Sequence, residues 1–208
     1  MSDLVRGVYH VTNPAWTLLG KPVNTTQGNV AMRSNLDPSG ATVALTDGAA
    51  FATGVCTAVA IPVEYGDIIN KISLVIGATA EGTGTHAVAG LYSGIATPAL
   101  LGSQTVDLTG ATAVGPASAV FSFTLPSGVL VTPTNAPNGF IYASIGVTAT
   151  TQPTAASYTV AAAVAYQWFT GAPLKMGALT HGSAIGATMP ATITSPSAQA
   201  VTPVYFLS

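Results

Sequence analysis

Three histidines are the side chains of this 208-residue sequence best suited to acid–base or metal chemistry, and they stand far apart, at His10, His86 and His181. None has a Cys, Asp or Glu at the spacing that metal-binding motifs use, so a metal centre would have to be assembled wholly by the fold. Catalysis would likewise require some of His86, His181, Asp107 and Glu64 to converge in space. We therefore predict a protein that is not an enzyme and that needs neither a metal ion nor a cofactor.

The carboxyl and thiol groups lead to the same expectation. The closest acidic pair, Glu64 and Asp67, flanks Gly66 in the motif EYGD, where Asp is favoured for local hydrogen bonds to the backbone of a turn. A glycosidase with paired carboxylates is therefore not expected. Cys56 is the only cysteine and lies in the alternating run VCTAVAIPV. One cysteine excludes a disulfide within the chain, and we interpret it as a small buried apolar side chain.

Two glycine-bearing motifs match catalytic loops only in part. GATAEGT, residues 77–83, has the glycines of a phosphate-binding loop but lacks its lysine, and no helix is expected after it. We interpret it as a hairpin turn. GLYSG, residues 90–94, puts Ser93 one place away from the nucleophile of G-x-S-x-G, again with no helix following. The sequence therefore does not predict a serine hydrolase.

Aromatic side chains cluster near the end of one expected strand, at Tyr166, Trp168 and Phe169. Flat rings stack on sugar faces while a Tyr hydroxyl or a Trp N–H stays hydrated, so Tyr166 and Trp168 are candidate contacts for a glycan. The other interpretation is a sandwich core or a contact between subunits. We favour this second interpretation, because aromatic residues are common in both places.

The composition restricts the classes of partner. Only 6% of the residues are charged, the net charge is −2, and 49% of the residues are hydrophobic. The five basic residues are scattered, so no basic patch for nucleic acid can be drawn. Low charge weakens the mutual repulsion that keeps free proteins dispersed. The composition therefore suits a subunit held in an assembly.

Neither membrane insertion nor export is expected. The longest apolar candidate, residues 158–169, is shorter than the ~18 residues that a spanning helix needs, and Gly171 and Pro173 follow it. The first residues, MSDLVRGVYHVTN, lack the charged start and the continuous apolar stretch of a signal peptide.

Alternation of apolar and polar residues from Val55 onward predicts β-strands with one buried face. One expected face carries Val55, Thr57, Val59, Ile61 and Val63, and the next strand carries Ile68, Ile72, Leu74 and Ile76. Further strands are expected over residues 86–92, 100–106, 120–125, 140–147, 158–165 and 203–207, with turns such as EGTGT, SGIATP, LPSG and NAPNG between them. Gly and Pro interrupt any helical period. We predict an all-β fold, an antiparallel two-sheet sandwich of the jelly-roll kind, with another Greek-key sandwich as the open alternative.

The distribution of charge divides the chain into two parts. Residues 1–50 hold half of the charged residues and show little periodicity, so we predict an extended N-terminal arm or docking segment there. Residues 51–208 are expected to form the sandwich body. Large apolar groups outside an alternating core usually mark an interaction surface. Trp16, Leu18 and Leu19 are therefore the expected docking contacts of the arm.

The run IPVEYGDIINKISLVIGATAEGTGTHAVAGLYSGIATPALLGSQTVDLTG, residues 61–110, resembles a segment of minor tail proteins from tailed phages of actinobacteria. Its matching features are a Gly-Asp turn, an apolar strand, a His-led strand ending in Leu-Tyr, and Thr-Pro-Ala-Leu-Leu. The C-terminal stretch GALTHGSAIGATMPATITSPSAQAVTPVYFLS is similar too, so the resemblance covers residues 55–208. The sequence departs from the family at Ala87 and Val88, where aromatic residues often follow the histidine.

The resemblance implies a non-enzymatic β-sandwich on the virion surface that acts in tail assembly or host attachment. We therefore expect a virion structural protein, either a minor tail or fibre component or a head decoration protein. Its expected partners are other virion proteins, copies of itself, with a trimer favoured by the resemblance, and a glycan of the host surface. The alternative function is a carbohydrate-binding module for a cell-surface glycan. The sequence does not separate a head from a tail location.

Overall fold

The computed structural model describes residues 33–35, 45–48, 51–109, 114–115, 117–159, 178–181, 186–199 and 201–208. Within these residues the regular structure consists of β-strands, and every pairing between named strands is antiparallel. The prediction of an all-β antiparallel fold is confirmed. The expected contacts at Trp16, Leu18, Leu19, Tyr166 and Trp168 lie outside the described residues.

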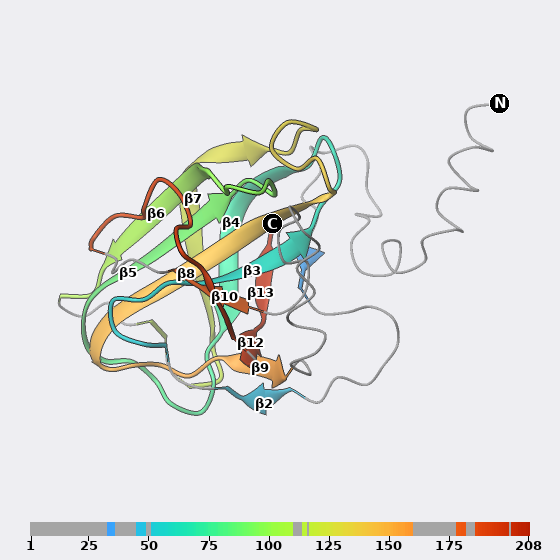
Figure 1. Cartoon of the computed structure of the whole chain (residues 1–208). Helices are drawn as coiled ribbons and strands as arrows, with labels where there is room; N and C mark the ends of the chain where they lie inside the picture. The colour runs from blue at the N-terminus through green and yellow to red at the C-terminus, as the bar shows by residue number, and fades with distance from the viewer. Residues whose placement is uncertain are drawn as a thin grey trace.

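The strands form three sheets (Figure 1). The six-stranded sheet has the order β11 (Ser197–Gln199), β10 (Ala178–Thr180), β3 (Thr57–Pro62), β8 (Phe140–Thr151), β5 (Gly82–Tyr92) and β6 (Leu100–Asp107). The four-stranded sheet has the order β1 (Arg33–Ser34), β13 (Tyr205–Leu207), β4 (Ile68–Val75) and β7 (Val120–Leu130). The three-stranded sheet consists of β12 (Val201–Pro203), β9 (Ala156–Thr159) and β2 (Thr46–Asp47).

The main core lies between the six-stranded and four-stranded sheets in a sandwich-like arrangement. Val59 and Ile145 of the first sheet and Leu74 and Phe123 of the second belong to one cluster of buried apolar residues. A second cluster lies on the other face of the six-stranded sheet, where Met189 and Ile193 pack over its strands. The jelly-roll connectivity stays a prediction.

Strand β3 is buried on both of its faces. Val59 and Ile61, which alternation assigned to the core, are fully buried in the main cluster. Cys56 and Ala58 point the other way, into the second cluster, and are fully buried too. The small side chains of Cys56 and Ala58 therefore pack under the segment with Met189 and Ile193, which covers the outer face of the six-stranded sheet.

Strand β4 departs from the predicted alternation at its start. The register with β7 shifts between Ile69 and Lys71, which is a bulge. As a result Ile69 is buried, whereas Ile68, which was expected in the core, is 43% exposed. The expected core positions Ile72, Leu74 and Ile76 are buried.

Three expected turns are corrected. GATAEGT, residues 77–83, is no hairpin, because β4 before it and β5 after it belong to different sheets. EGTGT, residues 81–85, lies largely within β5, whose register with β8 shifts between Gly84 and His86. LPSG, residues 125–128, lies within β7 opposite the bulge in β4. Glycine therefore marks irregular strand at two places where the sequence predicted a loop.

Two short strands from the first 50 residues pair with later strands. Arg33 lies opposite Leu207, so β1 extends the four-stranded sheet, and Thr46 lies opposite Ser157 in the three-stranded sheet. The extended arm and the boundary at residue 50 stay predictions. In the described part of the chain, no helix is long and apolar enough to cross a membrane.

Candidate functional site

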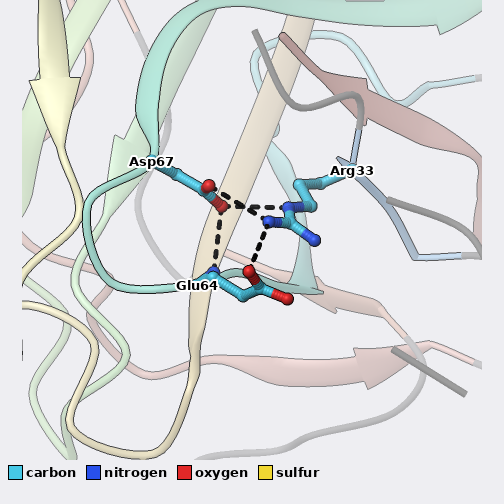
Figure 2. A network of polar contacts seen from close by, with 3 residues as sticks. All are labelled: Arg33, Glu64 and Asp67. Carbon is cyan, nitrogen blue, oxygen red and sulfur yellow. Dashed lines mark hydrogen bonds and ion pairs between the residues drawn. The ribbon is translucent and has the colours of Figure 1, made fainter. Parts of the chain in front are cut away.

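A buried ion pair holds the N-terminal strand β1 against the turn between β3 and β4 (Figure 2). Arg33 donates from Nε to Oδ2 of Asp67 at 2.9 Å and from Nη2 to Oδ1 at 3.0 Å, and each of the two residues is only 4% exposed. Glu64 Oε2 lies 3.5 Å from Arg33 Nη2. Two parallel bonds between a guanidinium and a carboxylate fix geometry as well as charge. Both carboxylate oxygens of Asp67 are therefore occupied, and the acidic pair of this turn serves the fold.

The turn itself has the form that the sequence predicted. Asp67 Oδ2 accepts a hydrogen bond from the Glu64 N–H at 2.9 Å, and the Asp67 N–H donates to the Glu64 carbonyl at 3.1 Å. Gly66 has a φ of 93°, which favours glycine. The expectation of local backbone bonds from Asp67 is confirmed, whereas the pairing with Arg33, 34 residues earlier, was not predicted.

Hydrogen bonds of Asn35 hold the segment of β1 to three other strands, β12, β13 and β9. Its Nδ2 donates to the carbonyl of Pro203 at 2.8 Å, and its Oδ1 accepts the N–H of Tyr205 at 2.9 Å. The Tyr158 hydroxyl donates to its backbone carbonyl at 3.0 Å. Residues 33–35 are thus held by side-chain bonds as well as by strand pairing, and their place on the body is specified by polar contacts.

Of the four residues that could have formed an enzyme site, two become neighbours. His86 lies opposite Asp107 in the pairing of β5 with β6, and both positions face solvent at least in part. The two ring nitrogens of His86 lie 3.2 Å from the hydroxyls of Thr85 and Thr148. Hydrogen bonds from Thr109 lower the pKa of Asp107, and the nearby His86 adds a smaller effect in the same direction. Asp107 is therefore stabilised as a carboxylate, which does not suit it to act as a general acid.

The other two residues lie in different places. Glu64 belongs to the Arg33 network, and His181 lies beside Cys56, a member of the second apolar cluster. The four residues therefore do not form one constellation. In the part of the chain that the structure describes, no group of three or more His, Cys, Asp or Glu side chains is placed to hold a metal ion.

A compact group of polar and sulfur-containing side chains surrounds His181. The His181 N–H donates to the Cys56 carbonyl at 3.0 Å, and Ser144 Oγ lies 2.9 Å from Nε2 of the ring. The Tyr92 ring meets the imidazole edge-on, with 5.4 Å between the ring centroids. Burial lowers the pKa of His181 to about 4. The imidazole is therefore neutral at pH 7.

Cys56 lies in the same group and is fully buried, as the sequence predicted. Its Sγ lies 3.5 Å from Sδ of Met189, so the thiol donates to the thioether. Burial raises the pKa of the thiol to about 12, against a smaller opposite effect of a hydrogen bond with Ser144. A thiol that stays protonated is a poor nucleophile, and catalysis by Cys56 is not supported.

A surface cleft of about 440 Å³ lies between the strands β6 and β7, which end their respective sheets among the described strands. Its lining consists of Leu101, Gly102, Ser103, Pro126, Ser127, Gly128, Val129, Leu130 and Asn135. Both strands are irregular here, because the registers of β5 with β6 and of β4 with β7 shift at these positions. None of the lining side chains that the structure describes is ionisable. The cleft therefore suits an uncharged group and offers no acid–base chemistry.

Large apolar side chains are exposed beside this cleft. Leu130 is 52% exposed and lies opposite Ile68 in the pairing of β7 with β4. Tyr65, in the turn before β4, is 56% exposed. Exposed apolar groups that lie near one another indicate an interaction surface. Tyr65, Ile68 and Leu130, together with the cleft, are the surface of the described residues best suited to contact a neighbour.

Comparisons with known proteins add no assignment. No protein-family model matches the chain, and no curated protein matches it.

Proposed function

We propose that this chain is a non-enzymatic structural protein on the exterior of a bacteriophage virion, where it acts in assembly, stabilisation or host attachment. The resemblance of residues 55–208 to minor tail proteins supplies the assignment to phages. A minor tail or fibre component and a head decoration protein both agree with it. The all-β sandwich and the weakly charged surface support this class of protein.

The observation that carries the proposal is the pair of uncharged edge strands around the cleft. β7 contains no charged residue, and β6 contains only Asp107 at its end. Isolated sheets commonly protect their edges with lysine. Pro126 and the irregular register protect one part of the β7 edge against pairing with another strand. The stretch from Val120 to Thr124 pairs regularly with β4 and has no such protection. β6 and β7 also lie close to each other, so a neighbouring subunit would cover their common uncharged surface around the cleft.

The few cations of the described residues support the same proposal. They are Arg33, which is buried in the ion pair with Asp67, and Lys71 on β4. A partner rich in phosphate would need clustered Lys and Arg, so nucleic acid is not a proposed partner. The proposed partners are other virion proteins and further copies of this chain. The resemblance favours three copies.

The proposal is tested on purified particles from cells that produce the protein. Mass spectrometry should find it in the particles at a fixed copy number, and antibody labelling followed by electron microscopy should place it at one location on the exterior. Particles of normal composition that lack the protein would overturn the proposal. Specific binding of a cell-surface glycan by the free protein, without incorporation into particles, would favour the carbohydrate-binding alternative.

A further inference from the structure

Strand pairing brings Cys56 and His181 together on the outer face of the six-stranded sheet. Thr57 of β3 lies opposite Thr180 of β10, and the next pair of residues is joined by the bond from the His181 N–H to the Cys56 carbonyl. Met189 covers this point and lies 3.5 Å from Cys56, measured between the sulfur atoms. A thiol, a thioether and an imidazole therefore come from three separate parts of the chain to one buried place.

One ring nitrogen of His181 has no hydrogen-bond partner among the residues that the structure describes. Nε2 lies 2.9 Å from Ser144 Oγ, whereas Nδ1 is buried and has no such partner. The residue as a whole is only 4% exposed. Buried polar atoms without a partner are rare in native proteins, and an ion that binds at the atom is one explanation of such a case. The unpartnered Nδ1 therefore points to a ligand, and this observation is independent of the sulfur pair of Cys56 and Met189.

We propose that Cys56, Met189 and His181 form a binding site for a soft monovalent metal ion, Cu(I) or its analogue Ag(I). Thiolate and thioether ligands select Cu(I) over harder ions, and imidazole binds copper as well. The proposal goes beyond the assembly function and does not depend on it.

Charge favours a monovalent ion over a divalent one. On binding, the Cys56 thiol releases its proton to solvent and the sulfur donates an electron pair to the ion, with no change in oxidation state. One thiolate and one monovalent ion make a neutral pair, which is compatible with an apolar environment. Zn²⁺ would leave an uncompensated positive charge and prefers four ligands. The positive charge of the ion also stabilises the thiolate that burial alone disfavours.

The two sulfur ligands require only a small adjustment. Two sulfur ligands at a metal–sulfur distance of about 2.3 Å lie about 4 Å apart when the ligand–metal–ligand angle is near 120°. The sulfur atoms of Cys56 and Met189 are 3.5 Å apart, so the pair has to open by a few tenths of an ångström. Methionine is unbranched and adapts its side chain easily. Its movement is the expected response to the ion.

The test is an anaerobic titration of the full-length folded protein with Cu(I), in competition with a coloured Cu(I) chelator. We expect one ion per chain and a new ultraviolet thiolate-to-metal absorption. Because Cys56 is the only cysteine, this absorption can come from no other thiol. Cys56→Ser should abolish it. Met189→Leu and His181→Asn should each weaken binding at least about tenfold, as is found when groups around a metal site are changed.

Matched controls come from the same chain. His86→Gln changes a histidine whose nitrogens both have hydroxyl partners, and Met32→Leu changes a methionine elsewhere in the sequence. Both should bind like the original protein. Binding of the ion only after unfolding would overturn the proposal, as would unchanged affinity in both His181→Asn and Met189→Leu. If Cys56→Ser does not fold, a rise in the melting temperature of the original protein with Ag(I), absent in Met189→Leu, decides the question.

Discussion

Replacing Arg33 with methionine is expected to lower the free energy of unfolding by about 3–5 kcal/mol, the range found when one member of a buried ion pair is removed. The reason is the carboxylate that remains. Asp67 is 4% exposed, and its carboxylate accepts three hydrogen bonds, two from the Arg33 guanidinium and one from the Glu64 N–H. Without Arg33, the Asp67 carboxylate would remain in a buried place with only the hydrogen bond from the Glu64 N–H. Urea unfolding of the full-length protein at pH 7 measures the change.

Two comparisons separate this effect from a general loss of packing. Lys71→Met removes an exposed cation from β4 and should change the free energy of unfolding by less than about 0.5 kcal/mol. The double variant Arg33→Met with Asp67→Asn keeps an acceptor for the Glu64 N–H but has no buried charge. It should therefore be more stable than Arg33→Met alone. Equal stability of these two variants would show that the unpaired carboxylate is not the cause.

Acid is expected to destabilise the metal-free protein through His181. Burial lowers the pKa of this histidine to about 4, from an ordinary value of 6.5. Below pH 6.5, His181 takes up a proton in the unfolded chain but stays neutral in the folded chain. The free energy of unfolding that this difference supplies above pH 6.5 is therefore lost as the pH falls toward 4. A pKa difference of this size between the folded and unfolded chain corresponds to a loss of roughly 3 kcal/mol in the free energy of unfolding. The ionisable neighbours of the ring are Cys56 and Tyr92, and burial keeps both neutral in this range.

The pH effect is measured as the difference between variants, because other groups titrate in the same range. Unfolding free energies from pH 7 to pH 4, with a chelator present, should fall less steeply in His181→Asn than in the original protein. His86→Gln, at a partly exposed histidine, should leave the slope nearly unchanged. The prediction is contradicted if His181→Asn and the original protein lose stability in parallel.

The strands could be predicted from the sequence because alternation survives in most of them. It failed at Ile68 and Ile69, where a bulge moves the buried position by one residue. It also failed to show that Ala58 is buried, because a strand covered on both faces needs a covering segment that alternation does not reveal. The two-residue strands β1 and β2 carry no periodic signal at all.

The candidate sites could not be predicted from residue spacing. Arg33 and Asp67 are joined by the position of β1 beside β13, and Cys56 and His181 by the pairing of β3 with β10. Both arrangements depend on strand order, which the sequence did not specify. The sequence named His181 and Cys56 separately, and only the fold brings them to one place. The signal that could have drawn attention to Arg33 is its place among few charges in an apolar chain.

We propose that uncharged contacts hold the protein in its assembly. Purified particles washed from low salt to about 1 M NaCl, where the Debye length falls from ~10 Å at 0.1 M to ~3 Å, test it most directly. Because apolar burial is little affected by screening, the account predicts that the bound amount of protein stays constant over this range. Denaturant or detergent, which weakens apolar burial, should release it. Progressive loss of the protein with NaCl would contradict the account, because it would mean that charged surfaces hold the protein in place.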